Sequence, residues 1–155
     1  MAAISSPLSD EARKVTGDAL QGALVDLVDL SLQAKQAHWN LIGKNFRSLH
    51  LQLDDVVDIA RNHMDVVAER AIAIGVNPDG RAETVAKSAH TKQLNEGYIS
   101  DEDVVKAFTA LLADIVKRFR QRVGDTDEPD PVTQDLLIAA TQDLEQQHWM
   151  FQAQR

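Results

Sequence analysis

Residues 37–75 read AHWNLIGKNFRSLHLQLDDVVDIARNHMDVVAERAIAIG, and this stretch decides the fold and the function that we predict for the chain. His38 ends one apolar-periodic segment and His50 begins the next, with the tripeptide GKN at 43–45 breaking the periodicity between them. Such a break is typical of a turn between two helices. In an antiparallel hairpin centred on this turn, each histidine lies six residues from the centre, so we expect both at the same height, where they can bind one metal ion.

Two carboxylates, Asp65 and Glu69, are four residues apart on the second predicted helix and therefore share a face. The helical step of 100° places Asp54 about 40° round the axis from His50. Asp65 lies about 60° and Glu69 about 100° from it, so the side chains occupy one sector. Their heights differ, because the stretch from His50 to Asp65 spans roughly 22 Å, whereas metal ligands lie about 2 Å from a shared ion. One hairpin therefore cannot bring the histidines and the carboxylates together.

Two copies of the hairpin satisfy this geometry. If their second helices pair antiparallel about a two-fold axis near Val57 or Asp58, His50 of one chain comes level with Asp65 of the other. The predicted metal site then belongs to a homodimer.

The same residues carry a family resemblance. AHWN at 37–40, a histidine twelve residues after the first, and DxxxE at 65–69 resemble the Dps miniferritins, and QDLLIAATQDLEQQHWMF at 134–151 is similar to the last helix of that family. The resemblance covers nearly the whole chain. It implies that His38 and His50 of one subunit, with Asp65 and Glu69 of its two-fold mate, are the metal ligands and catalytic residues of a ferroxidase centre.

This resemblance also implies an activity. We expect Fe²⁺ to be oxidised by hydrogen peroxide in preference to dioxygen, and the ferric product to be stored as mineral inside a hollow homododecamer that protects against oxidative damage. Glu69 is expected to bridge to a second, weaker iron site. Oxygen and imidazole ligands suit Fe²⁺, and zinc or manganese can compete for the same donors.

Two neighbours of the predicted centre have open roles. Asp54 lies one turn beyond His50, and three roles are open for it. It accepts a hydrogen bond from a metal ligand and so orients that ligand, it binds the metal weakly itself, or it is an ordinary solvated charge. Trp39 follows His38 directly. It either fills an interface or, as the resemblance implies, acts as a radical quencher near the iron.

The composition predicts a single all-α domain. The chain has 155 residues, is 44% hydrophobic and shows no convincing alternating strand pattern, so it can bury a sizeable helical core. We expect a flexible arm over 1–15 and a ferritin-like four-helix bundle over 16–155. The expected helices are 16–41, 46–74, 100–124 and 132–155, with a short extra helix near 83–88 in the long connection between the second and third.

The net charge and the amino-acid composition make several classes of function less compatible with this chain. The chain has no cysteine, which excludes disulfides and thiolate metal sites and fits a reducing compartment. No apolar run approaches the roughly 18 residues of a membrane span, and no signal peptide is apparent, so we expect a cytoplasmic protein. The net charge of -8 attracts cations and repels nucleic acid.

DNA binding is therefore not expected, although it is the activity for which the family is named. Arg13 and Lys14 are the only basic residues of the predicted arm, and the last predicted helix ends at Arg155 without a basic tail. A DNA-compacting protein and a structural metal-bound dimer without turnover are the two alternative functions.

An acidic segment, GDTDEPDPVTQD at 124–135, precedes the last predicted helix. Acidic residues at this position favour the helix dipole and solubility. The resemblance offers a second interpretation, in which carboxylates of this region ring a three-fold channel that admits Fe²⁺. Our candidates for that channel are Asp130 and Asp135.

The other histidines are given structural roles. His63 has no partner of comparable spacing and is expected in packing or at the surface, and His90 is expected in an exposed loop. Glu145 and His148 form a Glu-x-x-His pair, the motif of ordinary ferritin-like di-iron sites. The second such pair and the glutamate on the first helix that these sites require are missing, so His148 is expected to pack against a neighbouring helix.

Overall fold

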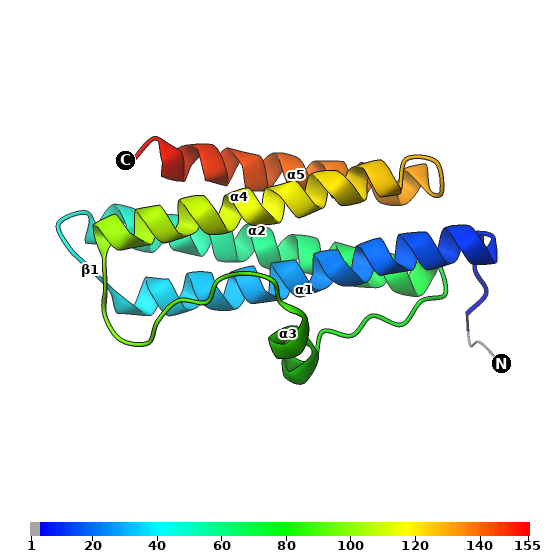
Figure 1. Cartoon of the computed structure of the whole chain (residues 1–155), viewed down its shortest axis with the longest axis horizontal. Helices are drawn as coiled ribbons and strands as arrows, with labels where there is room; N and C mark the ends of the chain where they lie inside the picture. Colours follow the sequence, from blue (N-terminus) through cyan, green and yellow to red (C-terminus); the bar gives the residue numbers. More distant parts are fainter. Residues whose placement is uncertain (1–3) are drawn as a thin grey trace.

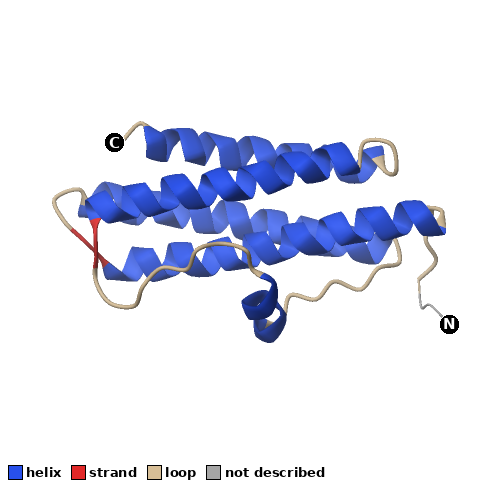
Figure 2. Cartoon of the chain, viewed as in Figure 1, coloured by secondary structure: helices blue, strands red, loops and turns tan. Residues whose placement is uncertain are grey.

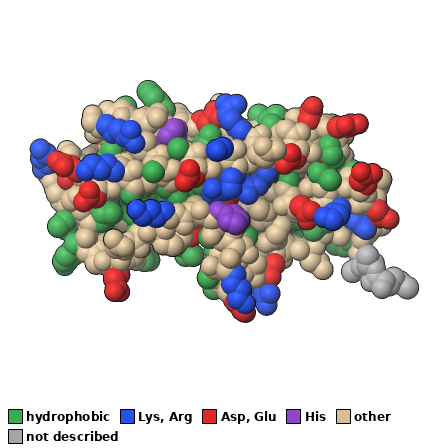
Figure 3. All heavy atoms as spheres, in the orientation of Figure 1, with side chains coloured by type: hydrophobic (Ala, Val, Ile, Leu, Met, Phe, Trp, Pro, Cys, Tyr) green, Lys and Arg blue, Asp and Glu red, His purple; other side chains and the backbone are tan. Residues whose placement is uncertain are grey.

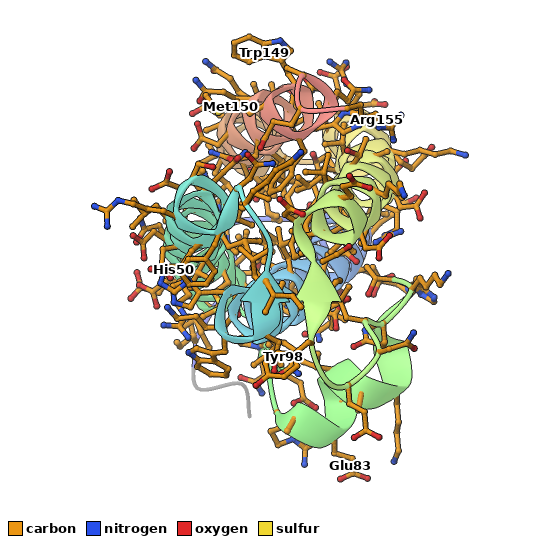
Figure 4. All side chains as sticks on the ribbon, turned by 90° about the vertical axis from the view of Figure 1, so that its left-hand side faces the viewer. His50, Glu83, Tyr98, Trp149, Met150 and Arg155 are labelled. Atoms are coloured by element: carbon orange, nitrogen blue, oxygen red, sulfur yellow. The ribbon has the colours of Figure 1, made fainter. Side chains whose placement is uncertain are left out.

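The computed structural model describes residues 4–155 and consists of five helices and one pair of very short strands (Figures 1 and 2). Four long helices form an antiparallel bundle, and the end-on view in Figure 4 shows them around a common core. The predicted all-α fold is confirmed. The helices are α1 Asp10–Asn40, α2 Phe46–Ala73, α3 Ala82–Ser88, α4 Asp101–Asp125 and α5 Pro131–Gln152, and the strands are β1 Leu41–Ile42 and β2 Ile99–Ser100.

The bundle is built from two hairpins, α1 with α2 and α4 with α5, joined by a connection that runs the length of the molecule past α3 (Figure 1). All four long helices contribute buried apolar residues to one core, from Leu20 on α1 to Phe151 on α5. The rings of Phe108 and Phe151 stack 5.4 Å apart between α4 and α5. Fully burying such a side chain stabilises the fold by about 2 kcal/mol, so this pair contributes to the packing of α4 against α5.

The first helix begins earlier than predicted. Ser9 caps it by accepting a hydrogen bond from the backbone N–H of Ala12 at 3.2 Å, and Asp10 and Glu11 in the first turn favour the helix dipole. The predicted arm over 1–15 is therefore wrong for residues 10–15, which are helical. The first three residues of that predicted arm lie outside the described part of the chain.

The strand pair was not predicted. β1 and β2 are parallel, with Leu41 opposite Ile99, and they join the α1–α2 turn to the start of α4. Gly43 in this turn has a φ of 137°, and a Cβ at that position would lie 2.4 Å from the carboxylate of Asp101. Asp101 in turn accepts a hydrogen bond from the backbone N–H of Asn45 at 3.0 Å. Two-residue strands leave no periodic signal in the sequence.

Side chains of α1 hold the long connection at two points. Gln21 donates to the carbonyl of Asp79 at 2.8 Å and accepts from its backbone N–H at 2.9 Å. Further along, the buried carboxylate of Asp29 accepts hydrogen bonds from Thr91 and Gln93. The short helix predicted between these points is confirmed as α3. Among residues 4–155, no helix combines the length and apolarity that a membrane span requires.

Candidate metal centre

His38 and His50 face each other where α1 ends and α2 begins, as predicted. Their imidazole rings stack with centroids 3.6 Å apart and planes 17° from parallel. Phe46, one turn before His50 on α2, stacks on the other side of that ring at 4.8 Å. Figure 4 shows His50 at the outer edge of the α1–α2 pair, away from α4 and α5. The equal height of the two histidines, inferred from their spacing about the turn, is confirmed.

Each histidine is held by the backbone of the other. His38 Nδ1 lies 2.8 Å from the carbonyl oxygen of His50, and His50 Nδ1 lies 2.9 Å from the carbonyl oxygen of His38. A carbonyl only accepts, so each Nδ1 is assigned the proton and donates it. The Nε2 atoms are then unprotonated in the neutral rings, with lone pairs available to a metal.

Lys35 and Asp54 lie beside the pair. Lys35 Nζ donates to Asp54 Oδ1, and the same oxygen lies 3.3 Å from His38 Nδ1. The hydrogen bond from Lys35 lowers the pKa of Asp54, and the positive charge of Lys35 adds to the effect. Asp54 is therefore ionised at neutral pH and favours the Nδ1–H form of His38.

Asp65 and Glu69 are exposed on α2 and do not approach the histidines of the same chain. Neither forms an ion pair with a described residue. No three His, Asp or Glu side chains within residues 4–155 are close enough to hold a metal together. A single chain thus presents a pair of histidines and, separately, a pair of carboxylates, so completion by a second chain stays a prediction.

α2 carries exposed apolar side chains near the two half-sites. Leu51, Val66 and Ile72 are 49%, 47% and 38% exposed. Of the two residues considered for a two-fold axis, Asp58 is exposed whereas Val57 is buried. Trp39 on α1 is 67% exposed next to His38. In one chain it fills no interface, and both roles considered for it stay predictions.

The two channel candidates have different surroundings. Asp130 is buried and accepts a hydrogen bond from Arg70 Nη2 at 2.7 Å and another from Thr133. Burial alone would raise the pKa of Asp130, but the bonds from Arg70 and Thr133 outweigh it, and the pKa is lowered. Asp130 thus ties the start of α5 to α2 within the chain. Asp135 is exposed on the first turns of α5.

The remaining histidines have structural surroundings. His63 Nε2 lies 2.7 Å from Asp143 Oδ2, a link between α2 and α5 that its spacing did not reveal. His90 is exposed and His148 is half-buried, as expected. Glu145 of the Glu-x-x-His pair accepts a hydrogen bond from Arg120 on α4, which fits our rejection of that pair as a metal motif.

Sequence reasoning missed the charged cluster around Asp26, which is buried on α1. Arg118 of α4 grips its carboxylate with Nε at 3.0 Å and Nη2 at 2.8 Å, and Arg122 adds Nη1 at 2.7 Å. The available signal was the segment LVDLVDLSL at 24–32, where two acids interrupt an apolar helix. Buried acids of this kind are rare unless they are paired.

Comparison with known proteins gives consistent matches. Residues 17–155 match the model of the ferritin-like domain family. DNA protection during starvation protein 2 of Deinococcus radiodurans is 36% identical over 92% of the chain, although the chain spans only 59% of that relative's length. The DNA protection during starvation protein of Agrobacterium fabrum is 31% identical over 94% of the chain and 91% of its own. A structure of Dps from Microbacterium arborescens in the high iron form superposes with a TM-score of 0.91, at 28% identity and 98% coverage of both chains.

Proposed function

The chain belongs to the ferritin-like domain family and, within it, to the Dps proteins, whose family function is iron storage and protection, and from this we propose that it is a ferroxidase that stores iron. Fe²⁺ is its substrate. It is oxidised at a centre shared between two subunits, and the ferric product collects as mineral inside a hollow homo-oligomeric shell, a dodecamer by family resemblance. Hydrogen peroxide is the proposed oxidant.

The observation that carries the proposal is the stacked histidine pair. Both Nδ1 atoms are engaged by carbonyl oxygens, so both Nε2 lone pairs are available at one place on the outer side of α1 and α2. Imidazole nitrogen with carboxylate oxygen is a donor set that suits Fe²⁺. To complete this donor set, the histidine pair needs carboxylates. Asp65 and Glu69 are exposed on the same helix as His50 and form no ion pair with a described residue.

In the proposed centre, His38 and His50 of one subunit and Asp65 and Glu69 of its mate hold one Fe²⁺. Glu69 can also reach a second, more weakly held Fe²⁺. Two Fe²⁺ ions each give one electron to one peroxide, whose O–O bond breaks, and with two protons it leaves as two waters. Asp54 keeps His38 in the metal-binding tautomer through its contact at Nδ1. Trp39, exposed beside His38, is placed to quench a stray radical.

The route of Fe²⁺ into the shell is proposed to be acidic. Because Arg70 neutralises Asp130 inside the chain, Asp135 is the stronger of the two channel candidates. The net charge of -8 per chain adds a general attraction for cations.

Peroxide should oxidise bound Fe²⁺ faster than air does. The test is anaerobic loading of the metal-free protein with Fe²⁺, followed by addition of peroxide or of air-saturated buffer. Ferric absorbance and particle size are recorded together.

Equal rates, or a faster reaction with air, would contradict a role in peroxide detoxification but would leave iron storage as the function. Metal bound without any oxidation would instead favour a structural metal-bound dimer. Prior loading with Zn²⁺ is the control for occupancy, because zinc accepts the same ligands but has no redox chemistry.

Direct binding to DNA is the second candidate function, suggested by the names of the relatives. We expect weak binding or none near neutral pH, because affinity for DNA in solution comes mainly from phosphate neutralisation by Lys and Arg. A dodecamer would carry about -96 before cations bind, and like charges repel. The measurement is a gel shift at about 0.1 M salt, where the Debye length is roughly 10 Å. Retardation without added divalent cations would show this expectation to be wrong.

A further inference from the structure

We propose that a pocket between α1, α3 and α4 binds a phosphate group, either as free phosphate or as a small phosphate monoester. We call it the α3 pocket. Its volume is about 460 Å³, and the lining residues used below are Gln21, Asp26, Thr84, Ser88, His90 and Arg122. It lies far from the histidine pair, because Asp26 and His38 are twelve residues apart on α1, roughly 18 Å along the helix.

The ion-pair cluster of Asp26, Arg118 and Arg122, in the wall of the pocket, has a surplus of positive charge. Asp26 is its buried acid, and one carboxylate is shared by the two guanidinium groups of Arg118 and Arg122. Arg118 and Arg122 both pair with Asp26, so the two guanidinium groups carry one positive charge more than the carboxylate neutralises. Figure 3 shows Lys and Arg atoms gathered at the centre of this face, above α3 and beside a histidine.

Arg122 also has unused hydrogen-bond donors. Its Nη1 bonds Asp26, whereas Nε and Nη2 make no hydrogen bond to a described residue. Neither atom is among the buried unsatisfied atoms of residues 4–155, so both are accessible to solvent. Nε and Nη2 form one edge of the guanidinium group, the edge that pairs with two oxygens of a phosphate or carboxylate.

Gly22 allows Arg122 to take this position. A Cβ on Gly22 would lie 2.7 Å from Nη2 and 3.0 Å from Nε, closer than atoms tolerate. The guanidinium group therefore lies against the backbone of α1, in the wall of the pocket, because residue 22 has no side chain.

The opposite wall offers two further donors beside an acid that is already paired. Ser88 lies on α3 and His90 follows the helix, whereas the hydroxyl of Thr84 donates to Asp79 at 2.7 Å. Asp79, also at the pocket, is neutralised by two hydrogen bonds from Arg81, which together with Thr84 lower its pKa strongly. An arginine on one side, with a hydroxyl and an imidazole on the other, suits an anion with oxygens pointing in several directions. A phosphate group has that shape.

The pocket is formed before any ligand arrives. The connection that carries α3 is fixed to Gln21 on one side of the pocket and to Asp29 on the other. Both anchors are hydrogen-bonded side chains of α1, so little ordering is left for a ligand to induce. A volume near 460 Å³ lies in the range of small-molecule sites and exceeds what a free phosphate needs.

The test is calorimetric titration of the assembled, iron-free protein with inorganic phosphate, adenosine monophosphate and adenosine in 0.15 M NaCl. Iron is removed first because phosphate binds ferric ions. We expect one phosphate-dependent site per chain. Arg122→Gln should weaken binding by at least about tenfold, the loss of one charged hydrogen-bonding group. Arg120→Gln is the matched control, because it removes the same charge from the same helix but pairs with Glu145 instead.

A second variant tests the position of the Arg122 guanidinium group without changing any charge. Gly22→Ala keeps every charge and is favourable in a helix interior, but its methyl group displaces the guanidinium group of Arg122. It should also weaken phosphate binding. Tighter binding of the monophosphate than of phosphate would identify an ester as the ligand, and equal binding would identify free phosphate. No binding to the wild type, equal losses in Arg122→Gln and Arg120→Gln, or equal affinity for adenosine and its monophosphate would each overturn the proposal.

Discussion

Mixing two inactive variants should restore about a quarter of wild-type iron oxidation, because the centre proposed here takes its ligands from both chains of a two-fold dimer. One variant has His38 and His50 changed to Ala, and the other has Asp65 and Glu69 changed to Ala. Alone, each should oxidise Fe²⁺ more than about a hundredfold more slowly, since loss of even an outer partner of a ligand costs 10–100-fold. The measurement is initial ferric absorbance after the variants are unfolded and reassembled together.

The recovered fraction follows from random pairing. About half of all dimers then contain one chain of each kind, and each such dimer has one intact site of two. If all four ligands came from one chain, no site in the mixture would be whole. Activity that stays at the level of the separate variants, with mixed dimers shown by mass spectrometry, would rule out the shared site. Glu96→Ala, which removes an exposed carboxylate elsewhere, should retain full activity in the same assay.

Removing the carboxylate of Asp26 should destabilise the fold by about 3–5 kcal/mol, the usual cost of breaking a buried ion pair from one side. Asp26 is 1% exposed, and Asp26→Ala leaves Arg118 and Arg122 close together without a counter-ion. The quantity to compare is the free energy of unfolding in urea, at one protein concentration because subunit association contributes to it.

Asp114→Ala is the matched control for this change. Asp114 is exposed on the same helix as the two arginines and makes no ion pair with a described residue. Its loss should alter the free energy of unfolding by less than about 0.5 kcal/mol. If Asp26→Ala were as stable as this control, the cluster would not be a structural link between α1 and α4.

The parts of the fold that depend on local pattern could be predicted from the sequence. Apolar periodicity gave the helices, the short α3 and the core, and the spacing of His38 and His50 about one turn placed their rings together. The early start of α1 was missed because the polar first turn has little periodicity. Capping chemistry at Ser9 decided that boundary.

The long-range polar contacts could not be predicted. Arg70 and Asp130 are sixty residues apart in the chain, and His63 and Asp143 are eighty apart. Such pairs depend on how each helix is rotated about its own axis in the bundle. The spacing of residues within one helix does not reveal that rotation. Asp130 is an example. The acidic segment suggested that its carboxylate lines a channel, whereas in the structure the carboxylate pairs with Arg70.

The tight turn between α1 and α2 bears on the order in which the chain folds and assembles. Contacts between residues close in sequence form early, because little loop entropy opposes them. The two histidines are twelve residues apart across this turn, so their half of the centre arises with the first hairpin, before the long connection has placed α4. The carboxylates of the proposed centre arrive only when a second folded chain docks. With the proposed shared centre, we expect a newly made subunit to acquire its redox chemistry only at the last step of assembly and an isolated subunit to be inert toward iron.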